Sequence, residues 1–364
     1  MPCTKELQID KSLPVLVTGG TGYVAGVLIS QLLDKGLTVH TTVRDPSKKD
    51  RIQYLQDVAD KSSGSIKFFK ADLLTPGAFE EAMQGCYAVF HTASPFTSEI
   101  KDPTKDLVEP AVHGTENVLL QCNKTPSVRR VVVTSSCVAI YTDAKETKEE
   151  SPTNEETWNR TATLTHGPYA LSKTLAEQKA WTIAGGQNHW TLCTINPSLV
   201  VGPGLKYHES SESFKLIKSL GSNDPNMAMG VPDFGLSCVD IRDVAAAHIA
   251  AAYLESAAGR HILSGPGYFI SELAEAMGKK YADEYPIATK RLPGAMKYIM
   301  WVVAPFMGQG LDRKSVMDNV GYKCHFDNTK SKESLGIEYI PMETSVQEMY
   351  QQMIDEKVVE PITK

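Results

Sequence analysis

The chain has 364 residues, 42% of them hydrophobic and 22% charged, which is typical of a globular protein with room for about two or three domains. Its 43 acidic and 37 basic residues give a formal net charge of −6, and no Lys/Arg cluster alternates with aromatic residues, so we expect no nucleic-acid partner. The N-terminus is charged, no apolar run reaches the roughly 18 residues that span a bilayer, and seven scattered cysteines lack metal-ligand spacing. These features predict a cytoplasmic protein with reduced thiols, no membrane span and no metal.

Short β-branched segments alternate with helical patterns over the first half of the chain. The predicted strands cover residues 14–18, 37–43, 66–71, 87–93, 128–135 and 190–197. Between the first two, apolar residues recur on one helical face from Val24 to Leu33, and Gly36 supplies a helix stop. Repeated strand–helix–strand units are typical of an α/β protein whose parallel sheet is covered on both faces. The sequence therefore predicts a doubly wound parallel sheet, the Rossmann fold.

This alternation is interrupted in the middle of the chain and becomes irregular after it. Residues 143–160 are rich in acids and have no apolar period, which predicts a solvated loop without a function. A helix is predicted near residues 210–220, and a Gly/Pro/Asn-rich stretch follows it. A short strand then leads into a helix whose start is marked by Asp240 and Asp243.

This change in pattern predicts that the chain forms two domains. Residues 1–201 are predicted to form a cofactor-binding domain, with strands from about 236–265 returning to its sheet. Residues 202–364 are predicted to form mainly a smaller, mixed C-terminal lobe that binds the substrate.

A glycine-rich turn joins the first predicted strand to the first predicted helix. Residues 15–26 read VLVTGGTGYVAG, and Gly20, Gly22 and Ala25 match the pattern Gly-x-Gly-x-x-Ala. In this position the missing side chains let backbone amides approach a pyrophosphate, so the turn predicts dinucleotide binding. The alternative is a tight turn that requires glycine for its conformation alone.

The residue after the second predicted strand is Arg44, where an NAD-binding unit usually has an acid for the ribose hydroxyls. A guanidinium suits a phosphate dianion and offers nothing to a neutral diol, so we expect a cofactor with a 2′-phosphate, NADP. Lys48 and Lys49 add positive charge nearby. The alternative is that these cations only form the solvated start of a helix.

A second group of polar residues follows the fifth predicted strand. Tyr169 and Lys173 are four residues apart, so on a helix they point from the same face. A free tyrosine has a pKa of about 10, and we expect the nearby ammonium to lower it and to stabilise the phenolate. Ser136, at the end of the strand, could donate a hydrogen bond to a substrate oxygen. The alternative for the Tyr–Lys pair is a chance pairing on a solvated helix face.

These segments together resemble the extended short-chain dehydrogenase/reductase family, and within it the dihydroflavonol reductase-like group of cinnamoyl-CoA reductases and aldehyde/ketone reductases. The matching pieces extend from residue 14 to about 350 and read LVTGGTGYVAG, TTVRDPSKK, KADL, HTASP, VVVTSSCVAIY, PYALSKTLAEQKAW, NPSLVVGPG and VDIRDVAAAH. The resemblance implies three catalytic residues, Ser136, Tyr169 and Lys173. It implies cofactor contacts at Gly19, Gly20, Gly22, Tyr23, Val24, Arg44, Lys49, Asp72, Leu73, Ala93, Lys173 and Pro197.

Within that set, the resemblance places Arg44 and Lys49 on the 2′-phosphate, Asp72 beside the adenine, and Ala93 and Pro197 along the nicotinamide. It also places Asn117 in the helix below the site. The chain departs from the group in two places: Tyr141 stands where dihydroflavonol reductases tend to have Asn, and residues 166–173 differ from the segment around the catalytic tyrosine of cinnamoyl-CoA reductases. Neither of those two substrates is therefore favoured.

The reading favoured by these residues is an NADPH-dependent reductase that turns an aldehyde or ketone into an alcohol, acting on a small carbonyl compound as a monomer or homodimer. A nucleotide-sugar epimerase or dehydratase is an alternative, against which Arg44 argues because those relatives mostly use NAD. A hydroxysteroid dehydrogenase is a second alternative. An NADP-sensing regulatory module is a third, and it would not need an intact Ser136, Tyr169 and Lys173.

An apolar substrate pocket is expected where the strand ends meet the second lobe. Its predicted side chains are Val138, Tyr141, Tyr207, Phe214, Met227, Met229, Phe234, Met300, Trp301 and Phe306. The apolar stretch 296–308 could instead contact a membrane surface, but its length and Pro305 favour a pocket wall. Three histidines among apolar neighbours, His91, His113 and His248, are expected to be core or rim residues and not metal ligands.

Overall fold

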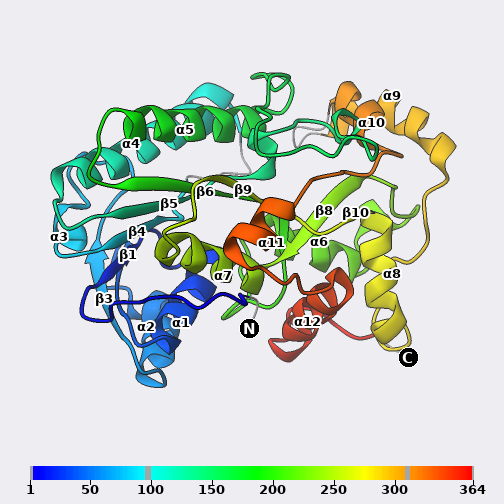
Figure 1. Ribbon diagram of the computed structural model, residues 1–364. Helices are drawn as coiled ribbons and strands as arrows, with labels where there is room; N and C mark the ends of the chain where they lie inside the picture. The colour runs from blue at the N-terminus through cyan, green and yellow to red at the C-terminus, as the bar shows by residue number, and fades with distance from the viewer. Residues whose placement is uncertain (1–2, 95–99, 308–311, 363–364) are drawn as a thin grey trace.

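The computed structural model describes residues 3–94, 100–307 and 312–362, and within them the predicted parallel sheet is confirmed (Figure 1). The large sheet has seven strands in the order β3-β2-β1-β4-β5-β6-β9, and every neighbouring pair is parallel. These strands are β1 (Val15–Val17), β2 (Thr38–Val43), β3 (Ser65–Lys70), β4 (Ala88–His91), β5 (Arg130–Thr134), β6 (Thr191–Pro197) and β9 (Gly259–Leu263).

Helices cover both faces of this sheet (Figure 1). Val15 and Val17 of β1 pack into one core together with α1 (Tyr23–Asp34), α2 (Lys49–Asp60), α7 (Ile241–Tyr253) and the end of α11 (Thr329–Leu335). Leu16 points to the opposite face, in the core under α3 (Glu80–Met83), α4 (Glu109–Lys124) and α5 (Pro168–Gly185). Burial on both sides explains why the strands read as continuous apolar runs. A short π-helical turn, Thr104–Val108, leads into α4.

A smaller mixed sheet forms the second lobe, as predicted. Its order is β10-β8-β7, with β8 (Gly235–Asp240) antiparallel to β10 (Gly267–Phe269) and parallel to β7 (Leu199–Val201). A separate core around Phe214, Leu273 and Tyr350 joins this sheet to its helices. The remaining helices of the lobe are α6 (Glu212–Leu220), α8 (Ile270–Tyr281), α9 (Lys297–Met307), α10 (Arg313–Asn319) and α12 (Met342–Asp355), with short helical turns at Pro225–Met227 and Gly294–Met296. Two further short turns, Cys137–Ala139 and Ala144–Glu146, follow β5 of the large sheet.

Two sequence-based expectations need correction. Of the strands expected to return from residues 236–265, only β9 joins the large sheet, because β8 pairs with β7 and β10 in the small one. The segment 143–160 is not simply solvated: Asp143 is 1% exposed and Asn159 is 7% exposed. A parallel bridge from Thr153 to Phe326 ties this segment to the C-terminal part of the chain. The placement of the domain boundary at residue 201 stays a prediction.

The chain segment before β1 is joined to the segment after α11. Cys3 and Ile337 form an antiparallel bridge, and the Thr4 N–H donates to the carbonyl of Gly336 over 2.9 Å. Leu335 and Ile337 lie in the same core as Val15 and Val17 of β1. Residues more than three hundred positions apart therefore complete one face of the large sheet.

Within the described part of the chain, the titratable side chains form no group that could hold a metal ion, and no helix is long and apolar enough to cross a membrane. All seven cysteines are free thiols, and six of them are buried. His91 contacts the Thr18 hydroxyl over 3.0 Å, and His248 lies 2.7 Å from both the Thr134 hydroxyl and the Val244 carbonyl. These two histidines are satisfied core residues, as expected.

Candidate active site

The candidate site lies where the order of the large sheet reverses. From β1 the chain adds β2 and β3 on one side, and β4, β5 and β6 on the other. In such sheets ligands bind outside the carboxyl ends of the strands at this switch point. The carboxyl ends of these strands are followed by Gly19, Arg44, Ala93 and Ser136, so four of the predicted site residues share this edge.

The glycine turn after β1 is shaped for a ligand that touches backbone. Gly19 has φ +69°, and a Cβ there would lie 3.0 Å from the Cβ of Ala93. A Cβ on Gly20 would lie 2.1 Å from the hydroxyl of Thr41, so no side chain fits there. Gly22 is the N-cap of α1, and no side chain caps that helix end. An uncapped helix start beside bare backbone suits a pyrophosphate.

Residues after β2 and β3 extend this edge toward the other end of a dinucleotide. Arg44 and Lys49 are exposed, and among the described residues neither forms an ion pair with a carboxylate. Two cations without a protein counter-charge suit a phosphate dianion. Asp72 follows β3, and the amide of Asn117 in α4 donates to the carbonyl of Leu73 over 3.0 Å. Asn117 therefore positions the loop that carries Asp72 and Leu73.

Tyr23 and Val24 start α1 and are partly buried. The Tyr23 hydroxyl donates to the carbonyl of Gly202 over 2.5 Å, and its ring packs edge-on against Phe214 at 5.1 Å between centroids. The Tyr23 side chain thus joins the two lobes, which leaves its backbone as the part suited to a cofactor contact.

Helix α5 presents Tyr169 in its first turn and Lys173 one turn later. The Lys173 ammonium lies 5.8 Å from the centroid of the Tyr169 ring and donates to the Ser94 hydroxyl over 3.1 Å. The two side chains therefore share one face of α5, as their spacing predicts, and Lys173 reaches the segment that follows β4. The Ser136 hydroxyl lies 3.5 Å from the carbonyl of Pro197, at the ends of β5 and β6.

Burial shifts the pKa values of both members of the pair. It lowers the pKa of Lys173 to about 8, against the opposing charge of Glu177. Although 37% of the Tyr169 residue is exposed, burial of its hydroxyl end raises its pKa to about 12. In the protein without its cofactor the pKa of Tyr169 therefore lies above its ordinary value of about 10, and not below it as expected. At neutral pH the tyrosine keeps its proton, which is the form that can donate one.

A buried carboxylate on the same helix was missed from the sequence. Glu177 is 1% exposed and receives hydrogen bonds from five surrounding side chains, those of Ser135, Trp181, Thr194, Asn196 and Arg260. Glu177 follows Lys173 by four residues and so shares its helix face, a signal that could have drawn attention to it.

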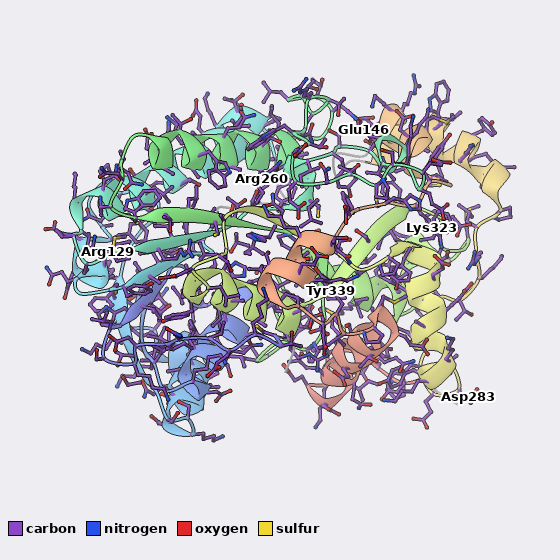
Figure 2. The ribbon with its side chains drawn as sticks, in the orientation of Figure 1. Arg129, Glu146, Arg260, Asp283, Lys323 and Tyr339 are labelled. Carbon is purple, nitrogen blue, oxygen red and sulfur yellow. The ribbon has the colours of Figure 1, made fainter. Side chains whose placement is uncertain are left out.

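Arg260 of β9 is the cationic partner of Glu177, at 2.6 Å, and lies between α5 and the sheet (Figure 2). Its guanidinium also donates to the carbonyl of Glu155 over 2.9 Å and stacks on the ring of Trp158 at 3.9 Å. Arg260 therefore anchors the acidic segment 143–160 against helix α5.

The expected pocket residues fall into different environments. Phe234 and Met300 both pack against Val316 of α10 and Val320, which follows that helix, so two of the expected segments contact the same cluster. Phe214 is fully buried in the core of the small lobe, which corrects the prediction for this residue. Tyr141 is partly buried and packs edge-on against Phe326 at 5.1 Å. Tyr207 and Met227 pack on the rim of the same small-lobe core, Val138 is partly buried, Met229 and Trp301 are exposed, and the side chain of Phe306 lies outside the described residues.

A doubly wound sheet with this glycine turn, an arginine after β2 and a Tyr–Lys pair on α5 defines a dehydrogenase or reductase of the short-chain type. Residues 16–281 match the model of the 3-beta hydroxysteroid dehydrogenase/isomerase family, and the chain belongs to that family. The resemblance to the dihydroflavonol reductase-like group is thereby confirmed.

Three comparisons illustrate this membership. The chain is 35% identical to cinnamoyl-CoA reductase CAD2 of Medicago truncatula over 347 residues, covering 94% of this chain and 96% of that one. It is 35% identical to an anthocyanidin reductase ((2S)-flavan-3-ol-forming) of Vitis vinifera, over 75% and 82% of the two chains. Its fold superposes on the crystal structure of Gre2 in complex with NADPH from Candida albicans with a TM-score of 0.75 and 29% identity, covering 94% and 99%.

Proposed function

We propose that the protein reduces an aldehyde or ketone to an alcohol with NADPH. The observation that carries the proposal is the Tyr169–Lys173 pair on α5, whose lysine contacts Ser94, the neighbour in sequence of the Ala93 that packs against the glycine turn. The relatives named above are reductases, and one of them was solved with NADPH. The glycine turn and the two uncompensated cations fit a dinucleotide with a 2′-phosphate.

In the proposed reaction, bound NADPH supplies the hydride. Lys173 would hold the nicotinamide ribose, and Ser136 would orient the carbonyl oxygen by donating a hydrogen bond to it. Tyr169, protonated at neutral pH, would give its proton to that oxygen as negative charge develops. The Lys173 ammonium would then stabilise the phenolate that remains. Ala93 and Pro197 would line the nicotinamide, and Asp72 the adenine.

The first test is a screen of NADPH oxidation by the purified protein. Aromatic aldehydes, aliphatic diketones, β-ketoesters and steroids are the substrate classes to compare, the last because the family model is named for steroid enzymes. Thermal protection by UDP- and GDP-sugars is measured in parallel. Protection by sugar nucleotides without turnover of any carbonyl compound would replace this proposal by a nucleotide-sugar enzyme. Tight NADPH binding without any turnover would instead favour the sensing module.

Arg44→Ala is expected to remove most of a preference for NADPH over NADH. A charge-assisted pair between Arg44 and a phosphate contributes on the order of 1.5–3 kcal/mol, so wild-type protein should prefer NADPH by roughly tenfold to a hundredfold. The measurement is kcat/KM with each cofactor. Arg51→Ala, which removes an exposed arginine of α2 instead, should leave the ratio unchanged. Equal use of both cofactors by the wild type would contradict the role given to Arg44.

We also place the protein in the cytoplasm. Seven free thiols, six of them buried, support a reducing compartment. Whether it acts as a monomer or a homodimer stays a prediction.

A further inference from the structure

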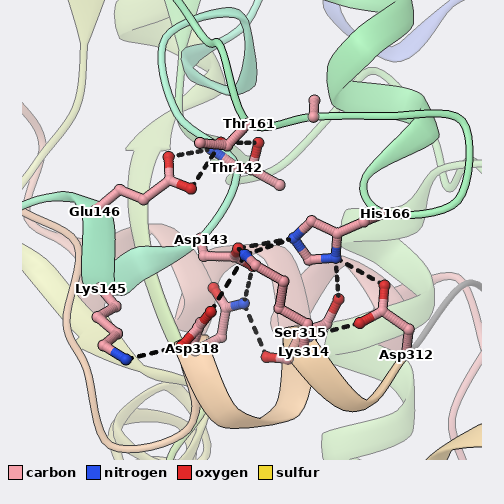
Figure 3. Close-up of polar contacts among 12 residues, drawn as sticks. Thr142, Asp143, Lys145, Glu146, Thr161, His166, Asp312, Lys314, Ser315 and Asp318 are labelled. Atoms are coloured by element: carbon pink, nitrogen blue, oxygen red, sulfur yellow. Dashed lines mark hydrogen bonds and ion pairs between the residues drawn. The ribbon is translucent and has the colours of Figure 1, made fainter.

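A group of charged side chains joins helix α10 of the second lobe to the start of the catalytic helix (Figure 3). The imidazole of His166 lies between two carboxylates, with Nε2 2.8 Å from Asp143 and Nδ1 2.7 Å from Asp312. Lys314 of α10 reaches the same Asp143 oxygen over 2.6 Å. We call these four residues the ionic clasp. Asn319 completes it by donating to the second Asp143 oxygen over 2.7 Å.

The charges of the clasp and its neighbours balance only when His166 is protonated. The acids are Asp143, Asp312 and Asp318, and the lysines facing them are Lys145 and Lys314. Three negative charges therefore meet two ammonium groups, and the imidazolium supplies the third positive charge. The Asp143 side chain is only 2% exposed, so an uncompensated charge there would be costly.

The remaining charged groups on the same elements have other partners. Glu146 accepts from the Thr142 N–H and the Thr161 hydroxyl, and Arg313 stacks on the ring of Trp301 at 4.5 Å. His166 is therefore the group of the clasp whose charge changes near neutral pH.

The clasp is rigidly coupled to the catalytic tyrosine. His166 precedes Tyr169 by three residues, and Gly167 between them has φ +70°. A Cβ on Gly167 would lie 2.8 Å from the Thr142 side chain, so the turn is closely packed. Pro168 then starts α5 at its first position, where its ring restricts the backbone. A movement of His166 would therefore also displace the start of α5, the helix that carries Tyr169.

On its other side the clasp holds an apolar wall. Asp312 caps α10 by accepting from the Ser315 N–H over 2.8 Å. One turn later, Val316 and then Val320 pack against Met300 of α9 and against Phe234. The contacts that place α10 against the catalytic side thus also place the apolar side chains that rest on α10.

We propose that the ionic clasp is a latch on the substrate side of the site: protonated His166 holds α10 and its apolar wall against the catalytic helix, and loss of that proton releases them. His166 is a positioning residue in this scheme, because it touches neither of the reacting groups. The proposal rests on the proposed function in one respect only, that the wall of Met300 and Phe234 borders the bound carbonyl compound.

The direction of the pH dependence follows from the environment of His166. Burial lowers its pKa, but hydrogen bonds and charge from Asp312 and Asp143 outweigh this, so the pKa of His166 is raised above its ordinary value of 6.5. A group with a raised pKa stabilises the folded contacts below its unfolded pKa and loses that contribution as pH rises through the folded value. The clasp should therefore be closed below the ordinary histidine pKa of 6.5 and should open as the pH rises through the higher pKa that His166 has in the folded protein.

Hydrogen exchange of the backbone amides in residues 313–319 tests this without any substrate. After correction for intrinsic exchange rates, wild-type protein should lose roughly five- to thirtyfold of its protection there between about pH 6 and about pH 9, the change expected for one or two interactions of this kind. His166→Gln should show the reduced protection at both pH values, with no step between them. Amides of β1, in the core of the large sheet, should stay equally protected in both proteins.

Asp312→Asn is a second variant, which tests the latch even if the His166→Gln protein does not fold. Asparagine can still cap α10 but carries no charge, so the helix should form while the step in protection moves to lower pH. His189→Gln is the matched control, because the ring of His189 contacts the carbonyl of Cys122 and packs edge-on against Trp190, and the residue precedes β6, at the end of that strand opposite to the candidate site. It should behave as wild type.

With a carbonyl substrate in hand, His166→Gln should raise KM for that substrate by a similar roughly five- to thirtyfold factor while the KM for NADPH stays constant. Unchanged protection of 313–319 in His166→Gln, or a step in wild type that Asp312→Asn does not move, would overturn the latch. Absence of carbonyl reduction would refute the proposed function, yet would leave the exchange result and the latch standing. A rise in the KM for NADPH as well as for the carbonyl substrate would show that His166→Gln distorts the whole site, and this result would also overturn the latch.

Discussion

Tyr169→Phe is expected to lower kcat by roughly 10²–10⁴-fold and to leave the affinity for NADPH unchanged. The substitution removes the hydroxyl that, in the proposed reaction, gives its proton to the substrate oxygen, and it keeps the ring beside Lys173. Because burial holds the pKa of Tyr169 at about 12, the proton is present over the whole range in which the protein would be assayed. The measurement is steady-state NADPH oxidation, together with NADPH titration by fluorescence.

Tyr87→Phe is the matched control. Tyr87 stacks on Tyr253 at 5.9 Å, just before β4 and therefore at the opposite end of that strand from the candidate site. The same loss of a phenolic hydroxyl there should leave kcat unchanged. Near-normal turnover in Tyr169→Phe would show that another group donates the proton, and the assignment of the catalytic helix would have to be withdrawn.

Glu177→Gln is expected to reduce the free energy of unfolding by about 3–5 kcal/mol. The carboxylate is the counter-charge of a guanidinium that is itself 6% exposed, so its neutralisation leaves Arg260 buried without a partner of opposite sign. All the side chains that bond to Glu177 donate to it, so a glutamine there would keep one accepting oxygen and would present an NH₂ group where the other carboxylate oxygen now accepts hydrogen bonds. Urea denaturation followed by fluorescence measures the loss.

Glu116→Gln provides the comparison on the neighbouring helix. Glu116 pairs with Lys179 of α5 at 3.3 Å, but both side chains are about one third exposed, 34% and 35%. Exposed pairs of this kind contribute about 0–1 kcal/mol, so this variant should be nearly as stable as wild type. If both Glu→Gln variants lost the same small free energy of unfolding, the hydrogen bonds around Glu177 would contribute no more to stability than an exposed ion pair does.

The parts of the site that sequence analysis could predict are those whose members are close together in the chain. The glycine turn, Arg44 after β2 and the spacing from Tyr169 to Lys173 all depend on one strand–helix unit each. Such units have their own backbone and side-chain signals, and the sheet order then places them on one edge because parallel strands end on the same side. The start of α7 at Asp240, whose carboxylate accepts from the Arg242 N–H over 2.8 Å, is predictable for the same local reason.

The parts that could not be predicted depend on residues far apart in sequence. Asp143 lies in an acidic segment without apolar period, which indicates a solvated loop, and it is buried only because Lys314 and Asn319 return to it from about 170 residues further along. Glu177 has Lys173 as a local clue, but its cation, Arg260, lies 83 positions away. The environment of Tyr169 also escaped prediction, because a local pair indicates the sign of a charge effect and not the extent of burial.

The joining of the first residues to the segment after α11 has a consequence for how the protein is made. A ribosome releases the N-terminal part of a chain first, at about 5–20 residues per second, and domains generally fold as units once they are complete. Here the sheet that carries the cofactor turn lacks its last strand until residue 263 has emerged, and one of its two cores lacks Leu335 and Ile337 for a further interval. Until then the nascent sheet has an incomplete core and an open edge on β6, a state that lasts several seconds at these rates and is prone to aggregation.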